Sequence, residues 1–380
     1  MMLLLVTSLL HWSAAMAPAA PAGGIERAPA ELSTRGYVEL FAEGRDLADS
    51  PVAERLGPGV DAHRALARAD LALDYQNGGW RLFAELFGSA AFEEGGSSGR
   101  VYQGWAGWTR ADRKLFLRAG KAGIGWGAAT VWNPVRTIEQ QKDLLFSDTA
   151  LEGEELAEVR LYGDRGNLAA IHLPERTGER AALWALRGAS SAGDVGLALS
   201  TVLGEGADHR FGLEATGVLG PVAWVGEALY RRRSPREFVA MDGGRRERGA
   251  GSYLSWVLGG NVTLPADVLV VLEHYHDAEG DSAADSRRLR ANLAENADLF
   301  DPLGRGRDRT FLGVSKRLFE LDGTLAANLF YDAASDTRTL QLRLEAHPLP
   351  DFQWTAVVLA FDGPGRLDRR IYQLRLRWSF

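Results

Sequence analysis

Hydrophobic and polar residues alternate with a period of two along most of the chain, from about residue 34 to the C-terminus. This period puts one kind of side chain on each face of a β-strand, whereas an amphipathic helix repeats every 3.6 residues. In the last segment, for example, Tyr372 and Leu374 share one face, while Gln373 and Arg375 share the other. About 18 segments follow the pattern, near 34–42, 65–75, 80–89, 100–110, 113–121, 154–162, 166–174, 180–189, 193–204, 208–218, 220–231, 251–264, 266–277, 308–320, 322–333, 336–347, 351–362 and 368–380.

The lengths of these segments and of the connections between them indicate a membrane barrel. Segments near ten residues are longer than the five or six usual in soluble sheets, and they match a tilted strand that crosses a hydrocarbon layer. Tight turns such as Gln76-Asn77-Gly78-Gly79 alternate with longer polar connections, which lie around 43–63, 90–99, 122–153, 232–250 and 278–307. The sequence therefore predicts an all-β fold, a closed antiparallel transmembrane β-barrel of about 18 strands with short periplasmic turns and long extracellular loops. An even strand count places both termini in the periplasm.

The N-terminus predicts export. An apolar run over 1–10 is too short to span a bilayer and is followed by small residues, with Ala-x-Ala sites ending at Ala17 and Ala22. We expect 1–22 to be a signal peptide and 23–380 to form the barrel. The chain has no cysteine, which excludes disulfides, thiol catalysis and a lipid-anchored cysteine.

Aromatic residues add a spacing argument. Three pairs stand six residues apart on one strand face, which is roughly 20 Å along a strand and close to the distance between the two aromatic girdles of a membrane barrel. The predicted girdle residues are Tyr102 and Trp108, Trp224 and Tyr230, and Tyr372 and Trp378.

Two segments carry a resemblance to known proteins. The alternating stretch 371–380, which closes on Phe380, resembles the assembly signal of bacterial outer-membrane barrels. The segment Phe116-Leu117-Arg118-Ala119-Gly120-Lys121, followed by Gly125-Trp126-Gly127 and Trp132-Asn133-Pro134, resembles a signature of porin-like and alginate-export-like barrels of about 18 strands. The resemblance implies that a solute passes across the outer membrane, and it does not name the solute. The implied partners are outer-membrane lipid and lipopolysaccharide, the barrel-assembly machinery and a small hydrophilic solute.

The connection 122–153 is the most informative part of the chain. It is longer than a barrel needs and is rich in apolar residues, whose exposure to water costs about 25 cal/mol per Å². We expect it to fold into the lumen with a rigid bend at Trp132, Asn133 and Pro134; an external cap packed on its neighbours is the alternative. The residues expected at the narrowest passage are Lys121, Arg136, Glu139, Lys142 and Asp143.

Charged residues occupy the face of the strands opposite the apolar one. The alternation turns Arg343, Arg369, Arg375 and Arg377 into the lumen together with several carboxylates, which can pair with them across strands. The mixture predicts modest ion selectivity, and the arginines of the last strand favour anions.

Other chemistry has weaker support. His274 and His276 share a strand face but lack a third metal ligand nearby, and the sequence has no Gly-x-Ser-x-Gly motif, so we expect no metal site, no cofactor and no enzyme. The net charge of −7 argues against nucleic acid as the partner of the arginines in 231–248. We expect these arginines to pair with lipopolysaccharide or to be solvated by water. The polar connection 278–307 is expected to be an external loop or a partial lid.

These features favour a porin-type channel for passive diffusion of small hydrophilic solutes. The alternative is a conduit that exports a polysaccharide with periplasmic machinery, and a third possibility is a barrel that acts as an adhesin or an enzyme.

Overall fold

The computed structural model describes residues 30–47, 63–92, 96–136, 138, 152–176, 181–204, 209–292, 295–296, 299, 301, 303–363 and 368–380. The expected signal peptide, 1–22, lies outside the described residues. The strands are β1 (Glu31–Leu47), β2 (His63–Asn77), β3 (Trp80–Ala91), β4 (Ser97–Thr109), β5 (Leu115–Ala122), β6 (Glu154–Tyr162), β7 (Gly166–Leu173), β8 (Leu183–Ala192), β9 (Val195–Gly204), β10 (Arg210–Leu219), β11 (Val222–Val239), β12 (Arg245–Leu264), β13 (Val268–His276), β14 (Asp308–Leu318), β15 (Gly323–Asp332), β16 (Thr337–Leu349), β17 (Phe352–Asp362) and β18 (Asp368–Ser379).

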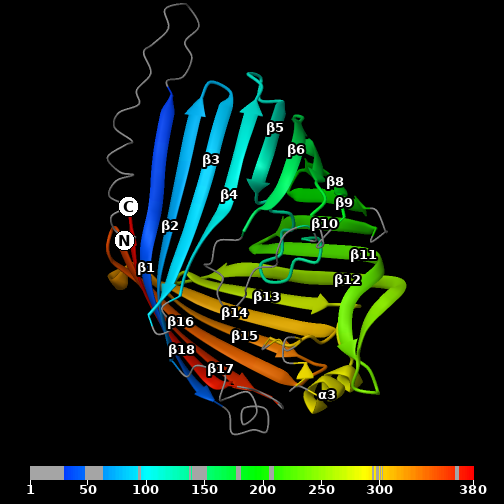
Figure 1. Cartoon of the computed structure of the whole chain (residues 1–380). Coiled ribbons are helices and arrows are strands. Elements are labelled where there is room, and N and C mark those ends of the chain that lie inside the picture. The colour runs from blue at the N-terminus through cyan, green and yellow to red at the C-terminus, as the bar shows by residue number, and fades with distance from the viewer. Residues whose placement is uncertain are drawn as a thin grey trace, which may run out of the picture.

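These 18 strands form one closed antiparallel barrel (Figure 1). Each strand pairs with its neighbours in the chain, and β1 closes the ring by pairing with both β2 and β18. At the seam, Gly36 and Phe380 exchange two backbone hydrogen bonds of 3.0 Å. The predicted fold class and strand number are confirmed.

The two faces of the wall differ in polarity as the alternation predicts. Outward positions carry large apolar side chains, such as Leu199, which is 65% exposed, and Leu374. Inward positions carry charged and amide side chains, such as Glu158, Gln373 and Arg375, which are buried inside the barrel. An apolar outer band around a polar interior is the arrangement of a barrel that stands in lipid.

The structure departs from the predicted elements at one end of the barrel. The connection predicted over 232–250 is mostly strand, because β11 and β12 continue as a long hairpin with register shifts near Arg233 and Glu237. Beyond the membrane the outer face of the hairpin no longer meets lipid, so the alternation disappears from the sequence while the strands continue. The connection after β13 contains the helix α3 (Ala283–Ala291), whose N-terminus is capped by Ser282 and Asp285 in a capping box. No helix in the described ranges is long and apolar enough to cross a membrane.

Candidate functional site

The segment that follows β5 enters the barrel and lies against the inner wall. Two carboxylates that point inward from the opposite wall hold its backbone. Glu227 of β11 accepts N–H bonds from Ala128 and Ala129 at 2.5 and 2.7 Å. Glu273 of β13 accepts three, from Thr130, Val131 and Trp132 at 2.5, 2.9 and 3.4 Å. Five consecutive backbone N–H groups are thus bound by two inward side chains, so 128–132 is fixed on the wall.

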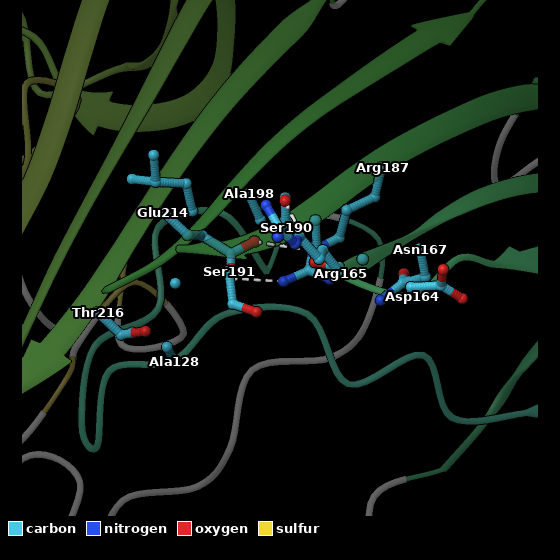
Figure 2. Close-up of a pocket in the computed structure, with 14 residues that line it drawn as sticks. Ala128, Asp164, Arg165, Asn167, Arg187, Ser190, Ser191, Ala198, Glu214 and Thr216 are labelled. Atoms are coloured by element: carbon cyan, nitrogen blue, oxygen red, sulfur yellow. Dashed lines mark hydrogen bonds and ion pairs between the residues drawn. The ribbon is translucent and has the colours of Figure 1, made fainter. Parts of the chain in front are cut away.

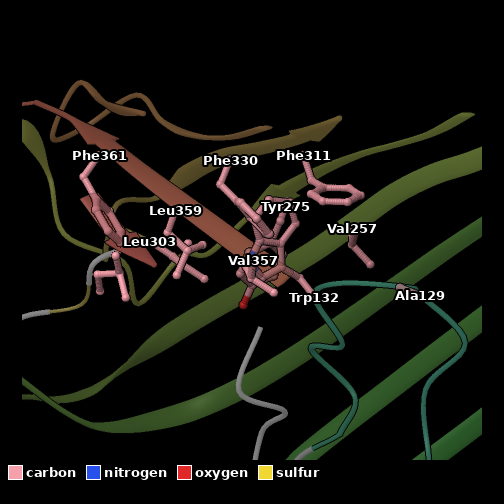
Figure 3. Packing of buried hydrophobic residues seen from close by; sticks show 11 residues of the cluster. Ala129, Trp132, Val257, Tyr275, Leu303, Phe311, Phe330, Val357, Leu359 and Phe361 are labelled. Carbon is pink, nitrogen blue, oxygen red and sulfur yellow. The ribbon is translucent and has the colours of Figure 1, made fainter. Parts of the chain in front are cut away.

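Trp132 anchors the segment in an aromatic cluster on the inner face of β13, β14 and β15 (Figure 3). Its ring stacks on Tyr275 with centroids 5.8 Å apart and meets Phe311 and Phe330 edge-on at 6.4 and 6.5 Å. The guanidinium of Arg309 lies 5.8 Å from the same ring. Aromatic pairs in such arrangements contribute about 0.5–1.5 kcal/mol each beyond the area that they bury.

A second apolar cluster holds the beginning of the segment and Ile138, which lies further along it, on a different part of the wall. Ile124, Trp126 and Ile138 are buried there against inward side chains of β6–β9, among them Leu156 and Ile171. The two clusters together tie the described part of the segment to β6–β9 and to β11–β15. The segment therefore crosses the lumen instead of leaving through the mouth of the barrel.

A compact bend stands between the two anchors. The side-chain amide of Asn133 donates to the carbonyl of Ala129 at 2.8 Å, and the backbone N–H of Arg136 donates to the carbonyl of Asn133 at 3.1 Å. Gly127 faces Asn133 with φ +93°, and a Cβ there would lie 2.4 Å from Asn133 Oδ1. Only glycine combines this left-handed conformation with so close an approach.

The residues predicted for the constriction have different positions. Trp132, Asn133, Pro134 and Arg136 lie in the segment inside the barrel, with Trp132 and Pro134 buried. Lys121 does not join them: it follows Arg118 by three residues and so lies on the opposite face of β5, where its ammonium binds the carbonyl of Val101 and the carboxylate of Glu152. Glu139, Lys142 and Asp143 lie outside the described residues.

The arginines predicted to face the lumen point inward and meet acidic or aromatic partners. Arg377 forms an ion pair with Glu39 at 2.7 Å, and Arg343 pairs with Glu345 at 2.5 Å. Arg375 lies 5.7 Å from the ring of Phe41. Arg369 stands on the same face of β18 as these residues and is exposed.

Further ion pairs follow the same rule around the wall. Glu158 forms ion pairs with Arg118 at 2.7 Å and with Arg160 at 2.5 Å, and Arg187 pairs with Glu214 at 2.9 Å. These lumenal charges are therefore compensated by a partner on the same strand or on a strand one or two positions away.

The predicted aromatic girdle residues face outward, with one exception. Tyr372 and Trp378 are each 44% exposed on the outer wall, and Trp224, Tyr230 and Trp108 share the outward parity of their strands. The position of Tyr102 differs from the prediction, because a β-bulge opposite Glu85 and Leu86 shifts the register of β4. Tyr102 is instead buried and stacks on Phe87, with ring centroids 4.7 Å apart.

The mouth with the long connections is bridged by ion pairs between the β11–β12 hairpin and the chain after β13. Arg236 binds Asp277 at 2.5 Å, and Arg248 binds Asp281 and Asp285 at 3.1 and 3.3 Å. Burial alone would raise the pKa of the Asp277 carboxyl, but Arg236 and Arg309 outweigh that effect and lower this pKa. Two of the arginines in 231–248, Arg236 and Arg248, therefore bind carboxylates of their own chain, while Arg232, Arg233 and Arg246 are exposed.

The two histidines of β13 contact side chains of the neighbouring strands β12 and β14. His274 and His276 bond to Thr310 and Asp308 at 3.1 and 2.7 Å and lie beside Trp256. In the described part of the chain, no group of three or more possible ligands is placed to hold a metal ion.

Sequence reasoning missed Glu227 and Glu273, the two residues that position the segment. Their signal is a single acid at an inward position within a run of apolar residues, as in Val270-Val271-Leu272-Glu273. A buried carboxylate costs free energy unless it has partners. An isolated inward acid among apolar neighbours therefore indicates that another part of the chain supplies donors.

Comparison with known proteins identifies the fold. No family model matches the sequence, and no curated protein is similar to it in sequence. Among solved structures, OccK8 (OprE) of Pseudomonas aeruginosa is 10% identical and aligns over 92% of this chain and 98% of its own, with a TM-score of 0.59. The outer membrane protein OprD from Pseudomonas aeruginosa is 13% identical over 92% of this chain and 94% of its own, with a TM-score of 0.57. The chain therefore has the closed 18-stranded barrel fold of the outer membrane protein OprD.

Proposed function

We propose that this chain is a bacterial outer-membrane channel through which small hydrophilic solutes diffuse passively. An 18-stranded barrel is too wide for the side chains of its wall to fill, so its interior holds water unless other chain occupies it. The apolar outer face fits lipid, and the paired charges of the inner face fit a wet passage. The even number of strands supports the placement of both termini in the periplasm.

The observation that carries the proposal is the attachment of the segment after β5 across the lumen. Five backbone N–H groups bound by two carboxylates hold it in a fixed position. A fixed segment narrows the passage to a constant size, which suits selection among small solutes. Export of a polysaccharide is the less favoured function, because a thick polymer needs an unobstructed bore or a segment that moves aside.

The residues around the narrowest passage are part of this proposal. Arg136 follows the bend inside the barrel, and Glu139, Lys142 and Asp143 continue the chain beyond it. We infer that these side chains contribute charge at the constriction. Lys121 is not included, since Glu152 holds it on the other face of β5.

Assembly and lipid contacts complete the proposal. Phe380 faces outward at the seam, with its ring packed over Gly36, which suits recognition of the closing strand by the barrel-assembly machinery. The outward aromatic residues suit the interfaces of a membrane whose outer leaflet contains lipopolysaccharide.

Single-channel current across a planar bilayer tests the proposal. The full-length barrel is expected to give discrete, ohmic current steps in the absence of any partner. Deletion of 128–148 is expected to raise the conductance of a barrel that still assembles, as judged by its altered mobility in unheated gels. An assembled deletion variant with unchanged conductance would place the segment outside the conducting path, and a full-length barrel without current would overturn the channel function.

A further inference from the structure

A recess of about 390 Å³ lies beside the segment that crosses the lumen (Figure 2). Ala128 of that segment forms one side, and inward residues of β8, β9 and β10 form the wall. Its rim includes Asp164 and Arg165 of the β6–β7 turn, at the end of the barrel that carries the short turns. The volume is at the small end of the range of about 300–1,000 Å³ that is typical of ligand sites.

The recess exists because small residues occupy successive inward positions. Ala189, Gly196 and Ala198 line the wall, where larger side chains would fill the space. The adjacent part of the same wall is filled instead: a Cβ at Gly212 would lie 2.9 Å from Val135, which packs there. The segment that crosses the lumen therefore packs against one part of the inner wall and leaves the neighbouring part of that wall uncovered.

Polar groups of balanced charge line this open part. Arg187 donates to both oxygens of Glu214 at 3.0 and 2.9 Å, in a bidentate pair whose side chains are 22% and 5% exposed. The pair uses two of the five guanidinium N–H groups, and each carboxylate oxygen retains a lone pair. At the rim, Asp164 and Arg165 carry opposite charges as well.

Hydroxyl groups face the same space. Thr216 follows Glu214 on the inward face of β10, and Ser191 lies on the inward face of β8. Gly196 leaves the Thr216 hydroxyl uncovered, since a Cβ at that glycine would lie 2.8 Å from Thr216 Oγ1. The recess thus offers hydroxyl, carboxylate and guanidinium groups close together.

We propose that this recess binds a neutral polyhydroxylated solute of monosaccharide size beside the constriction. A vicinal diol can donate to Glu214 and accept from Arg187 at the same time, while Thr216 and Ser191 exchange hydrogen bonds with further hydroxyls. A solute with a net charge gains less binding free energy, because each pair of opposite charges in the recess both attracts and repels it, and the two effects cancel. The route of the solute rests on the proposed channel function, but the binding itself does not.

Three solutes that share one scaffold and differ in charge make the direct test. Glucose, glucuronate and glucosamine are each titrated against the full-length barrel in detergent, and binding is read by saturation-transfer NMR. Glucose is expected to bind most tightly, and the two charged analogues more weakly. Equal binding of all three, tighter binding of a charged analogue, or no saturation-transfer signal from glucose would overturn the proposal.

Variants separate this recess from the rest of the lumen. Thr216→Val removes one hydroxyl at nearly constant volume and is expected to weaken glucose binding about threefold to tenfold. Ala198→Leu fills the space and is expected to abolish binding. Thr355→Val, which changes an inward threonine of β17, is the matched control and is expected to bind glucose like the unaltered chain. Equal affinities in all three variants would place any glucose site elsewhere.

Current recordings distinguish this inference from the channel function. Glucose added on the short-turn side is expected to cause brief partial blockades that Ala198→Leu removes while ionic current continues. Ionic current without glucose binding in the NMR experiment refutes the recess and leaves the channel. Glucose binding in a barrel that gives no current supports the recess and refutes the channel.

Discussion

The substitution Glu273→Gln is expected to release the segment that crosses the lumen, whereas Glu227→Gln is expected to leave it in place. Glu273 uses both oxygens: Oε1 accepts from Thr130, and Oε2 accepts from Val131 and Trp132. A glutamine keeps one acceptor and turns an N–H₂ group toward N–H donors at the other position. Glu227 accepts from Ala128 and Ala129 through Oε1 alone, so a glutamine there preserves both bonds.

The size of the effect follows from the bonds that are lost. Hydrogen bonds to charged groups contribute about 1.5–3 kcal/mol each, and a buried donor without a partner costs about 1–3 kcal/mol. The loss of one or two of the three bonds to Glu273 therefore amounts to about 2–4 kcal/mol, which is roughly a 30-fold to 1,000-fold shift toward the undocked segment.

Two measurements follow this shift. Amide hydrogen exchange at 128–132 is expected to accelerate by that factor in Glu273→Gln and to change little in Glu227→Gln. Single-channel current of Glu273→Gln is expected to show added noise and a higher mean conductance. Equal exchange rates and equal current noise in the two variants would show that the carboxylate of Glu273 does not hold the segment.

Further predictions concern assembly, selectivity and pH. Deletion of Phe380 removes the ring over Gly36 and the last pairing of the seam, so the amount of heat-modifiable barrel in membranes is expected to fall while the chain still reaches the periplasm; an unchanged amount would contradict this. The paired charges of the lumen predict weak selectivity with a slight preference for anions, so the reversal potential in a tenfold salt gradient should stay near zero, and a strong cation preference would refute it. Because the pKa of Asp277 is lowered in the folded chain, its ion pairs stabilise the mouth above the unfolded value of about 3.9 and lose this effect as the pH falls below it. Limited proteolysis of 277–292 is therefore expected to be slow at pH 7 and faster near pH 3, and the same rate at both would refute the effect.

The barrel was predictable from the sequence because its wall lies between two different media. Lipid outside and water inside require opposite polarity at successive residues, so the period of two marks each strand. The strand β6, for example, begins and ends at the predicted residues, 154 and 162. Where a segment no longer lies between lipid and water, its secondary structure could not be predicted from alternation. The hairpin beyond Arg231 and the helix α3 have no lipid on one side, and they contact each other through Val239 and Leu289, so no alternation marks them.

The candidate site was less predictable, because contacts distant in sequence determine it. The apolar residues of 122–153 show that the segment needs burial, but the partners of Trp132 come from three strands more than 140 residues further along the chain. The bulge that turns Tyr102 inward likewise depends on how β3 and β4 pair, and not on the composition of either strand.

The attachment of the segment through its backbone has a consequence for variation and for engineering. Glu227 and Glu273 bind N–H groups, which every residue except proline possesses, so the position of 128–131 depends little on which side chains stand there. Trp132 is the exception, because its ring anchors the segment in the aromatic cluster. Thr130 is exposed within this stretch, and it can be exchanged for a charged, aromatic or thiol-bearing residue while the main chain keeps its place. The backbone hydrogen bonds thus fix the position of the segment, while the side chain at position 130 is free to vary. A barrel used as an analyte sensor could therefore be given a different selectivity by substitution of Thr130 alone.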